Sequence, residues 1–197
     1  MDDVINFGGK KIFQMQIAFF QIIHLAKNNW VIRASTWAKK FFAEEHFENK
    51  IEALVRLEQV SISFKALFNA TDFEDAVIQG DYVVCLAIQE KDDKWQLGVS
   101  FVNQQILYAS FDSFREAERE MKRIINKAEI YDAIELLGAA FVRDKIVIIK
   151  KDEKKKKIKL FFVNGDYFEI FFKDKKELEA TCEEIINFSY PNEDQEG

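Results

Sequence analysis

The feature that most limits the possible folds of this chain is a repeat at an offset of 61 residues. At this offset, Phe101-Val102-Asn103 corresponds to Phe162-Val163-Asn164, and Ile124-Ile125-Asn126 corresponds to Ile185-Ile186-Asn187. Ten of the 35 positions from Asp92 to Asn126 are identical, without a gap. Apolar residues alternate with polar ones before each FVN triplet, which is the pattern of half-buried strands. We therefore predict an internal duplication of a βββα unit.

Each copy is expected to contain three antiparallel strands and a helix with a side-chain cap at its start. The expected strands of the first copy are 82–88, 96–102 and 106–111, followed by a helix that Asp112 or Ser113 caps and that ends at Lys127. Those of the second copy are 145–150, 158–163 and 167–172, followed by a helix from Asp174 to Asn187. A further helix is expected near Ile130–Ala140.

The register of the second hairpin can be predicted from its apolar residues. A three-residue loop at Asn164–Asp166 pairs Phe162 with Phe168 and Leu160 with Ile170, so one face of the hairpin is apolar. The same loop length in the first copy pairs Phe101 with Leu107 and gives an equivalent face. A sheet of three strands buries little by itself, so helices should cover this face.

The first part of the chain shows apolar residues three and four positions apart, which predicts helices. We expect helices over Lys10–Lys27, from Ser35 through Phe47, and from Ile51 toward Phe68. The predicted organisation is a mainly helical region (1–78), a first βββα repeat with a linking helix (79–140), a second βββα repeat (141–190) and a polar tail (191–197). The predicted fold class is α+β, with antiparallel sheet packed by helices.

Composition narrows the classes of partner. The net charge is −6, so general attraction to nucleic acid or anionic lipid is not expected. The most apolar segment, Phe13–Ala26, is shorter than the roughly 20 residues of a spanning helix, so we expect no transmembrane segment. Two cysteines and an acidic start without a cleavage-site pattern favour a cytoplasmic protein. Phe accounts for 20 residues, which predicts a large aromatic core or a surface buried by a partner.

Motifs for catalysis or cofactor binding are missing from the sequence. Neither GxxxxGK[ST] nor GxGxxG occurs, and neither His24 nor His46 has a carboxylate at the helical spacing that a metal site needs. Cys85 and Cys182 lie in apolar patterns without a nearby His partner in sequence. We expect no catalytic residues, no metal and no cofactor, which favours a protein that is not an enzyme without deciding the point.

Two short resemblances concern the second copy. GDYFE at Gly165–Glu169 resembles the GDFYE element of the MutS mismatch-repair family, whose Phe stacks on a mismatched base. Tyr167 takes that position here, but the first copy reads NQQILY at Asn103–Tyr108 and no P-loop is present, so we do not transfer the role. The stretch Ile158–Ile185 is similar to the last hairpin and helix of pleckstrin-homology-like domains, which implies a shared local structure and no particular function.

The leading functional hypothesis is a non-enzymatic protein–protein interaction or adaptor module that binds another protein or a second copy of itself. Its candidate partner-binding residues are the aromatics Phe19, Phe20, Trp30 and Trp37. One alternative is a nucleic-acid-associated module that uses the basic hairpin Lys150–Lys159. Its candidate phosphate-contacting residues are Lys154, Lys155, Lys156 and Lys157. A second alternative is a small-ligand binder or enzyme with its site between the repeats.

Overall fold

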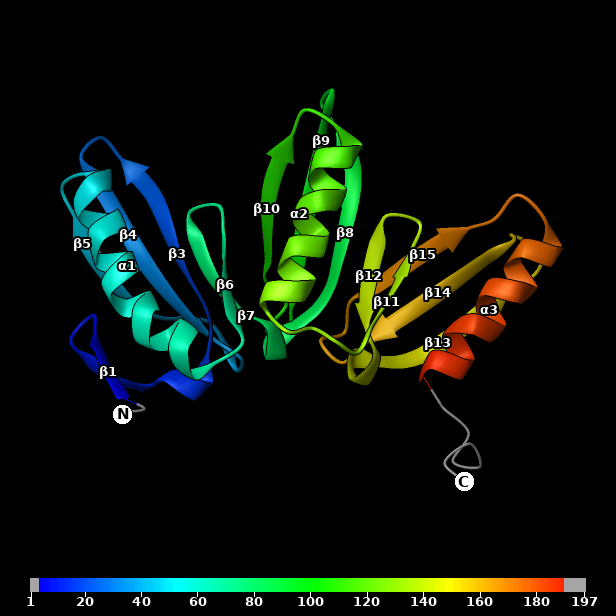
Figure 1. Cartoon of the computed structure of the whole chain (residues 1–197), viewed down its shortest axis with the longest axis horizontal. Helices are drawn as coiled ribbons and strands as arrows, with labels where there is room; N and C mark the ends of the chain where they lie inside the picture. The colour runs from blue at the N-terminus through cyan, green and yellow to red at the C-terminus, as the bar shows by residue number, and fades with distance from the viewer. Residues whose placement is uncertain (1–3, 190–197) are drawn as a thin grey trace.

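The chain begins with strands, and one order of elements occurs three times along it (Figure 1). A computed structural model describes residues 4–189, except for the side chains of residues 39 and 40. We refer to residues 4–67, 70–127 and 133–189 as the first, second and third units. Each unit contains a short hairpin, a 3₁₀ turn, three antiparallel strands and an α-helix, in that order.

The elements of the first unit are β1 (Val4–Phe7), β2 (Lys10–Phe13), the 3₁₀ turn η1 (Gln14–Gln16), β3 (Ile17–Ala26), β4 (Asn29–Thr36), β5 (Lys39–Phe47) and α1 (Lys50–Leu67). Those of the second are β6 (Ala70–Phe73), β7 (Ala76–Gln79), η2 (Gly80–Tyr82), β8 (Val83–Lys91), β9 (Lys94–Phe101), β10 (Ile106–Phe111) and α2 (Phe114–Lys127). Those of the third are β11 (Ala133–Leu136), β12 (Ala139–Val142), η3 (Arg143–Lys145), β13 (Ile146–Asp152), β14 (Lys157–Phe162), β15 (Tyr167–Phe171) and α3 (Lys175–Ser189).

The sheets connect the units, because the hairpin of a later unit joins the sheet of the unit before it. The first five-stranded sheet has the order β5-β4-β3-β7-β6, and the second has the order β10-β9-β8-β12-β11. Among residues 4–189, the third sheet contains only β13-β14-β15, and β1 pairs only with β2. All pairs between neighbouring strands are antiparallel.

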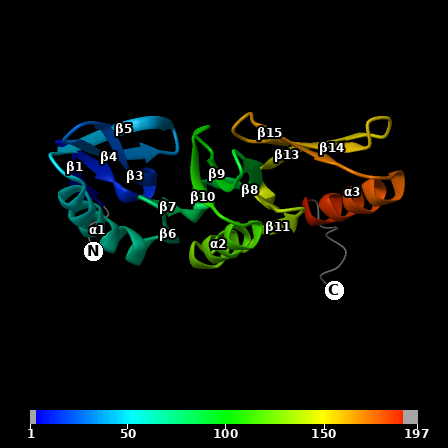
Figure 2. The same cartoon turned by 90° about the horizontal axis from the view of Figure 1, so that it is seen from above.

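All three helices of residues 4–189 lie on the same side of the sheets, and the units follow one another along the long axis of the molecule (Figures 1 and 2). Each helix begins at a side-chain cap followed three residues later by Glu, which is the sequence of a capping box. The caps accept hydrogen bonds from the backbone N–H groups of these Glu residues, in the pairs Asn49–Glu52, Ser113–Glu116 and Asp174–Glu177.

Three apolar clusters form the core, and each contains residues of more than one unit. Phe19 of β3 packs with the second unit, where its ring centroid lies 4.7 Å from that of Phe101. Val84 of β8 belongs to the cluster of the third unit, together with Phe162. The long strands β3 and β8 therefore contribute side chains to both their own unit and the next one.

The structure has a mixed α+β fold with antiparallel sheets, but the predicted helical region at residues 1–78 is wrong. Lys10–Lys27 forms β2, η1 and β3, and the segment from Ser35 to Phe47 belongs to β4 and β5. Only the helix after Ile51 is present, as α1. The segment Ile17–Phe20 is buried on both sides of its sheet, by α1 and by the second unit, so it lacks the alternation that indicates a strand.

Two further expectations need correction. The segment predicted as a helix near Ile130–Ala140 is largely the hairpin β11–β12, so the layout of two βββα units with a linking helix is not what the chain shows. The predicted hairpin registers are displaced by two residues, because the three-residue loops lie one position earlier than expected. Leu160 pairs with Phe168 and Val99 pairs with Leu107, which leaves the predicted faces unchanged.

Candidate functional site: the open edge of the third sheet

The central strands β3 and β8 are each covered at one edge by the hairpin of the next unit. Phe19 pairs with Ile78 across the first boundary, and Cys85 pairs with Phe141 across the second. Phe19 and Cys85 therefore occupy equivalent positions. Each follows a β-bulge that comes directly after the 3₁₀ turn. The same bulge in β13 places Ile148 at this position in the third unit.

The equivalent edge of β13 has no strand beside it in the part of the chain that the structure describes. The consequence is visible at the bulge residue. Ala18 in β3 and Val84 in β8 are 0% exposed, whereas Val147 in β13 is 50% exposed. Ile148, the neighbour of Val147, is 45% exposed, and its equivalent Phe19 is 1% exposed. Val147 thus faces solvent where both other units bury the equivalent residue, and Ile148 faces solvent where the first unit buries Phe19.

The backbone of β13 also offers a hydrogen-bonding position at this edge. The N–H of Ile22 donates to the carbonyl of Asp75 at 2.8 Å, and the N–H of Ile88 donates to the carbonyl of Gly138 at 2.9 Å. Both donors lie three residues after the equivalent positions Phe19 and Cys85. The corresponding residue in the third unit is Lys151, whose N–H faces the open edge by this equivalence. An open row of such groups is a template for an added strand.

Positive charge lies beyond the apolar part of the edge, toward the end of β13. Lys150 lies over the ring of Phe161 at 5.1 Å from its centroid. Lys151 forms an ion pair with Glu153 at 3.0 Å, and this hydrogen bond raises the pKa of Lys151. Lys159 lies on the neighbouring strand β14, 3.6 Å from Glu169. The edge therefore changes along its length from apolar, at Val147 and Ile148, to basic.

The predicted aromatic partner-binding residues do not form one surface. Phe19 and Phe20 are buried in the chain's own core, so a partner does not reach them in the folded protein. Trp30 is partly buried and stacks on His24 at 4.3 Å between ring centroids. Trp37 is 51% exposed, in the turn between β4 and β5. The structure therefore does not bring these four side chains together.

The four predicted phosphate-contacting lysines lie in and after the turn between β13 and β14. Lys154, Lys155 and Lys156 are exposed, and the Nζ of Lys156 donates to the carbonyl of Lys173 at 2.9 Å. Lys157 begins β14 and forms an ion pair with Glu169 at 2.7 Å. Part of the positive charge of this hairpin is thus already matched by the protein.

The open edge is not predicted by the 61-residue repeat, because that repeat compares the second and third units only from Asp92 onward and leaves out β8 and β13. The signal lies in the segments around the 3₁₀ turns, which read QGDYVVC at Gln79–Cys85 and VRDKIVI at Val142–Ile148. Their alignment predicts that β13 resembles β8 and presents an equivalent edge.

Residues 4–189 contain neither a metal-binding cluster nor a helix that could span a membrane. No three His, Cys, Asp or Glu side chains of this range lie close enough to hold a metal ion. Within the same range, none of the helices combines the length and the apolar character that crossing a membrane requires. Comparison of the chain with protein-family models, with curated proteins and with solved structures finds no match.

Proposed function

We propose that this chain is a non-catalytic protein-binding module that accepts an extended segment of another protein along the open edge of β13. The observation that carries the proposal is the difference between this edge and its two equivalents. β3 and β8 are each completed by a hairpin, and within residues 4–189 β13 is not. Strand addition supplies backbone hydrogen bonds for affinity, and alternate side chains supply specificity.

The side chains along β13 define the chemistry of the partner segment. Val147 and Ile148 require apolar residues opposite them, because they are the exposed members of otherwise buried positions. Lys150 and Lys151 favour acidic residues at the other end of the segment, since opposite charges directly across a strand pair are stabilising. The expected partner is therefore an antiparallel strand or hairpin with an apolar half and an acidic half.

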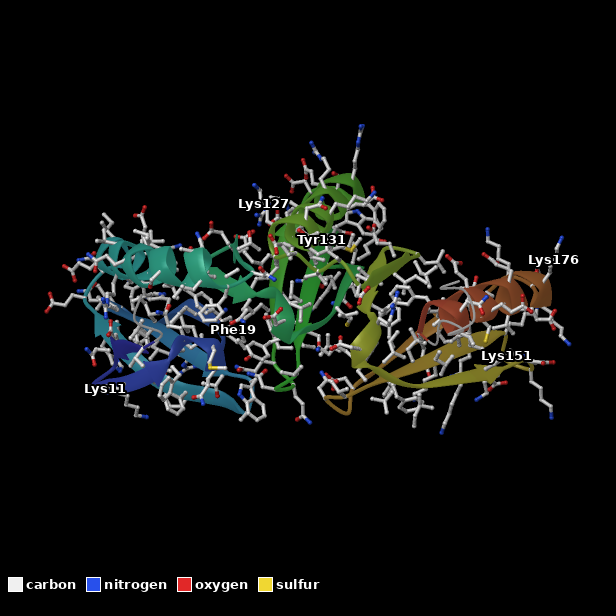
Figure 3. The ribbon with its side chains drawn as sticks, turned by 60° about the horizontal axis from the view of Figure 1, so that its bottom comes forward. Lys11, Phe19, Lys127, Tyr131, Lys151 and Lys176 are labelled. Carbon is white, nitrogen blue, oxygen red and sulfur yellow. The ribbon has the colours of Figure 1, made fainter. Side chains whose placement is uncertain are left out.

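A second copy of this chain does not fit the edge well. Its free hairpin would place Lys10 opposite Lys150, because the equivalent pairs are Ala76 with Gln21 and Ala139 with Ala87. Like charges directly opposite each other destabilise a strand pair. Lys11 and Lys151 lie at opposite ends of the molecule, so head-to-tail contact of two copies would bring these basic regions together (Figure 3).

The open edge is also part of a proposal about the origin of the chain. The internal duplication predicted from the sequence extends, on this proposal, to three units that arose from one. The shared element order and the bulge after each 3₁₀ turn support it. The two free cysteines are compatible with the cytoplasmic location that we include in the proposal.

A synthetic hairpin tests the proposed function directly. The probe is a backbone-cyclised peptide of residues 130–145 with Ala139→Glu, which carries the strand that covers β8 and places an acid opposite Lys150. Cyclisation is needed because isolated hairpins are only marginally stable. Titration followed by amide chemical shifts should give saturable changes at residues 147–151. A matched peptide with Ala139→Lys should bind more weakly, and the difference should shrink at high salt.

A pair of variants isolates the role of the backbone. Lys151→Pro removes the outward N–H, and Lys151→Ala removes the same side chain while keeping that donor. Binding of the Ala139→Glu peptide should be lost in the first variant and retained in the second. Equal binding to both variants, or shift changes confined to other parts of the molecule, would overturn strand addition at β13.

A further inference from the structure

A pocket lies at the boundary between the second and third units, away from the open edge of β13. Its volume is about 340 Å³, and it is formed by the open face of the second sheet and the β14–β15 hairpin of the third unit. The loop of this hairpin reaches the second unit, where Asn164 Nδ2 donates to the carbonyl of Phe101 at 3.0 Å. The volume falls in the range of small-molecule sites.

The floor of the pocket consists of small side chains from two cross-strand pairs. Cys85 pairs with Ser100, and Ala87 pairs with Gly98. The equivalent pairs in the first sheet are Phe19 with Ser35 and Gln21 with Arg33. In the third sheet they are Ile148 with Phe161 and Lys150 with Lys159. Only the second sheet, among the three described, has four small residues at these positions.

At the first boundary between units, an aromatic side chain fills the space that is open at the second boundary. At the first boundary, the ring of Phe19 packs 4.7 Å from the ring of Phe101, and both side chains are buried. At the second boundary Cys85 stands in the place of Phe19, and Phe162 stands in the place of Phe101 and lines the pocket. The pocket therefore occupies the space that a phenyl ring fills one unit earlier.

Aromatic side chains form the walls around this space. Tyr108 of β10 lines one side, and Tyr167 and Phe168 of β15 line the other. The ring of Tyr108 lies against Gly98, where an added Cβ would be 3.1 Å from its Cε1. Aromatic walls of this kind favour a planar ring through offset or edge-to-face contacts.

The polar groups of the pocket indicate a ligand with a hydrogen-bond donor. The Asp166 carboxylate lines the pocket and accepts one hydrogen bond, from Asn164 Nδ2 at 2.8 Å, which leaves further acceptor capacity. Burial raises the pKa of the Cys85 thiol to about 12, with the charge of Asp166 adding to the effect. The thiol therefore stays neutral at physiological pH and serves as apolar surface.

We propose that this pocket binds a small aromatic molecule that carries a hydroxyl or N–H donor. Its ring takes the place that the Phe19 side chain has at the first boundary, between Phe162 and the floor residues Cys85 and Ala87. Its donor faces Asp166. This site does not depend on strand addition at β13, and either could exist without the other.

Phenol and cyclohexanol form a matched pair of probes, since both carry one hydroxyl on a six-membered ring. Phenol should give saturable amide shifts at Gly98 and Gly165 in the intact chain, and cyclohexanol should bind more weakly. Fragments of this size bind weakly, so the titration must extend to about 10 mM. No saturable change with phenol in this range, or equal binding of the two probes, would overturn the proposal.

Substitutions at the floor locate the site. Cys85→Phe introduces the residue of the first boundary and should abolish the phenol shifts, whereas Cys85→Ala should retain them. If Cys85→Phe fails to fold, Ala87→Gln tests the same point with the residue found at the equivalent position of the first sheet. Retention of phenol binding in a folded, filled variant would contradict the assignment.

Discussion

Asn103 and Asn164 connect successive units through buried hydrogen bonds. Asn103 Nδ2 donates to the carbonyl of Thr36, at the end of β4, and Asn164 Nδ2 donates to the carbonyl of Phe101, at the end of β9. Each side chain also accepts a hydrogen bond from the backbone N–H two residues later, which stabilises its own loop. The Asn residues of the two FVN triplets thus connect their own unit to the preceding one. This role cannot be recognised when each unit is considered alone.

Asn164→Ala should lower the free energy of unfolding by about 1–3 kcal/mol, because the carbonyl of Phe101 loses a buried donor. Asn103→Ala should have an effect of similar size at the first boundary. The matched control is Ala38→Asn, since Ala38 also lies two residues after the end of the second long strand but is exposed. Chemical denaturation measures all three variants, and a cost at position 38 equal to that at 164 would contradict the connecting role.

At the scale of elements, the sequence predicted best where one face of a strand is covered. β10 (Ile106–Phe111) and α2 after Ser113 lie where expected, because β10 alternates in polarity and α2 has a capping box. β3 was mistaken for a helix because its first residues, Ile17–Phe20, are covered on both faces. The partner that covers its second face comes from a later unit, and this long-range contact is not visible in the local sequence.

The candidate site was less predictable than the fold for the same reason. An open edge is a strand edge without a neighbouring strand among the described residues. The exposure of Val147 and Ile148 at this edge can be recognised only when β13 is compared with β3 and β8. The pocket likewise depends on differences between equivalent positions, such as Cys85 against Phe19. Neither the open edge nor the pocket can be assigned to particular residues until the registers of the three sheets are known.

Glu45 ties three elements of the first unit together, and its ionisation should affect stability. Its carboxylate accepts from Arg56 Nε at 2.7 Å and from the backbone N–H of Gly8 at 3.0 Å, which joins β5 to α1 and to the turn between β1 and β2. Burial alone would raise the pKa of Glu45, but the hydrogen bonds from Arg56 and Gly8 outweigh it, so the pKa is lowered.

A carboxyl group with a lowered pKa in the folded state stabilises the fold above its unfolded pKa, and the contribution is lost as pH falls through the folded pKa. The free energy of unfolding should therefore decline below about pH 4.5 more steeply in the wild type than in Glu45→Gln. At neutral pH the variant should be less stable by about 1 kcal/mol, since the pair is partly exposed. Denaturant titrations across this pH range measure both effects, and parallel curves would show that Glu45 is not the group responsible.

At the scale of the whole molecule, the three units differ in how completely they are covered. The first sheet is covered by α1 on one face and by the second unit at the β3 edge, and the second sheet has the same arrangement with the third unit. The third sheet has α3 on one face and lacks a following unit among the described residues. Since stability in repeated arrays depends on contacts between neighbours, the third unit should open most readily.

Native-state hydrogen exchange tests this order at three equivalent amides. The N–H groups of Ile22 and Ile88 are hydrogen-bonded to the next hairpin, so they should be strongly protected. The N–H of Lys151 lies at the open edge and should exchange fast, while Leu160 in the middle of the same sheet stays protected. Addition of the Ala139→Glu hairpin should then slow exchange at Lys151 without changing Ile22. If the Lys151 amide is as protected as that of Ile88 in the free protein at every concentration, the edge is already covered by the chain itself. If its protection rises with protein concentration, a second copy covers the edge. Either result would remove the site proposed for strand addition from another protein.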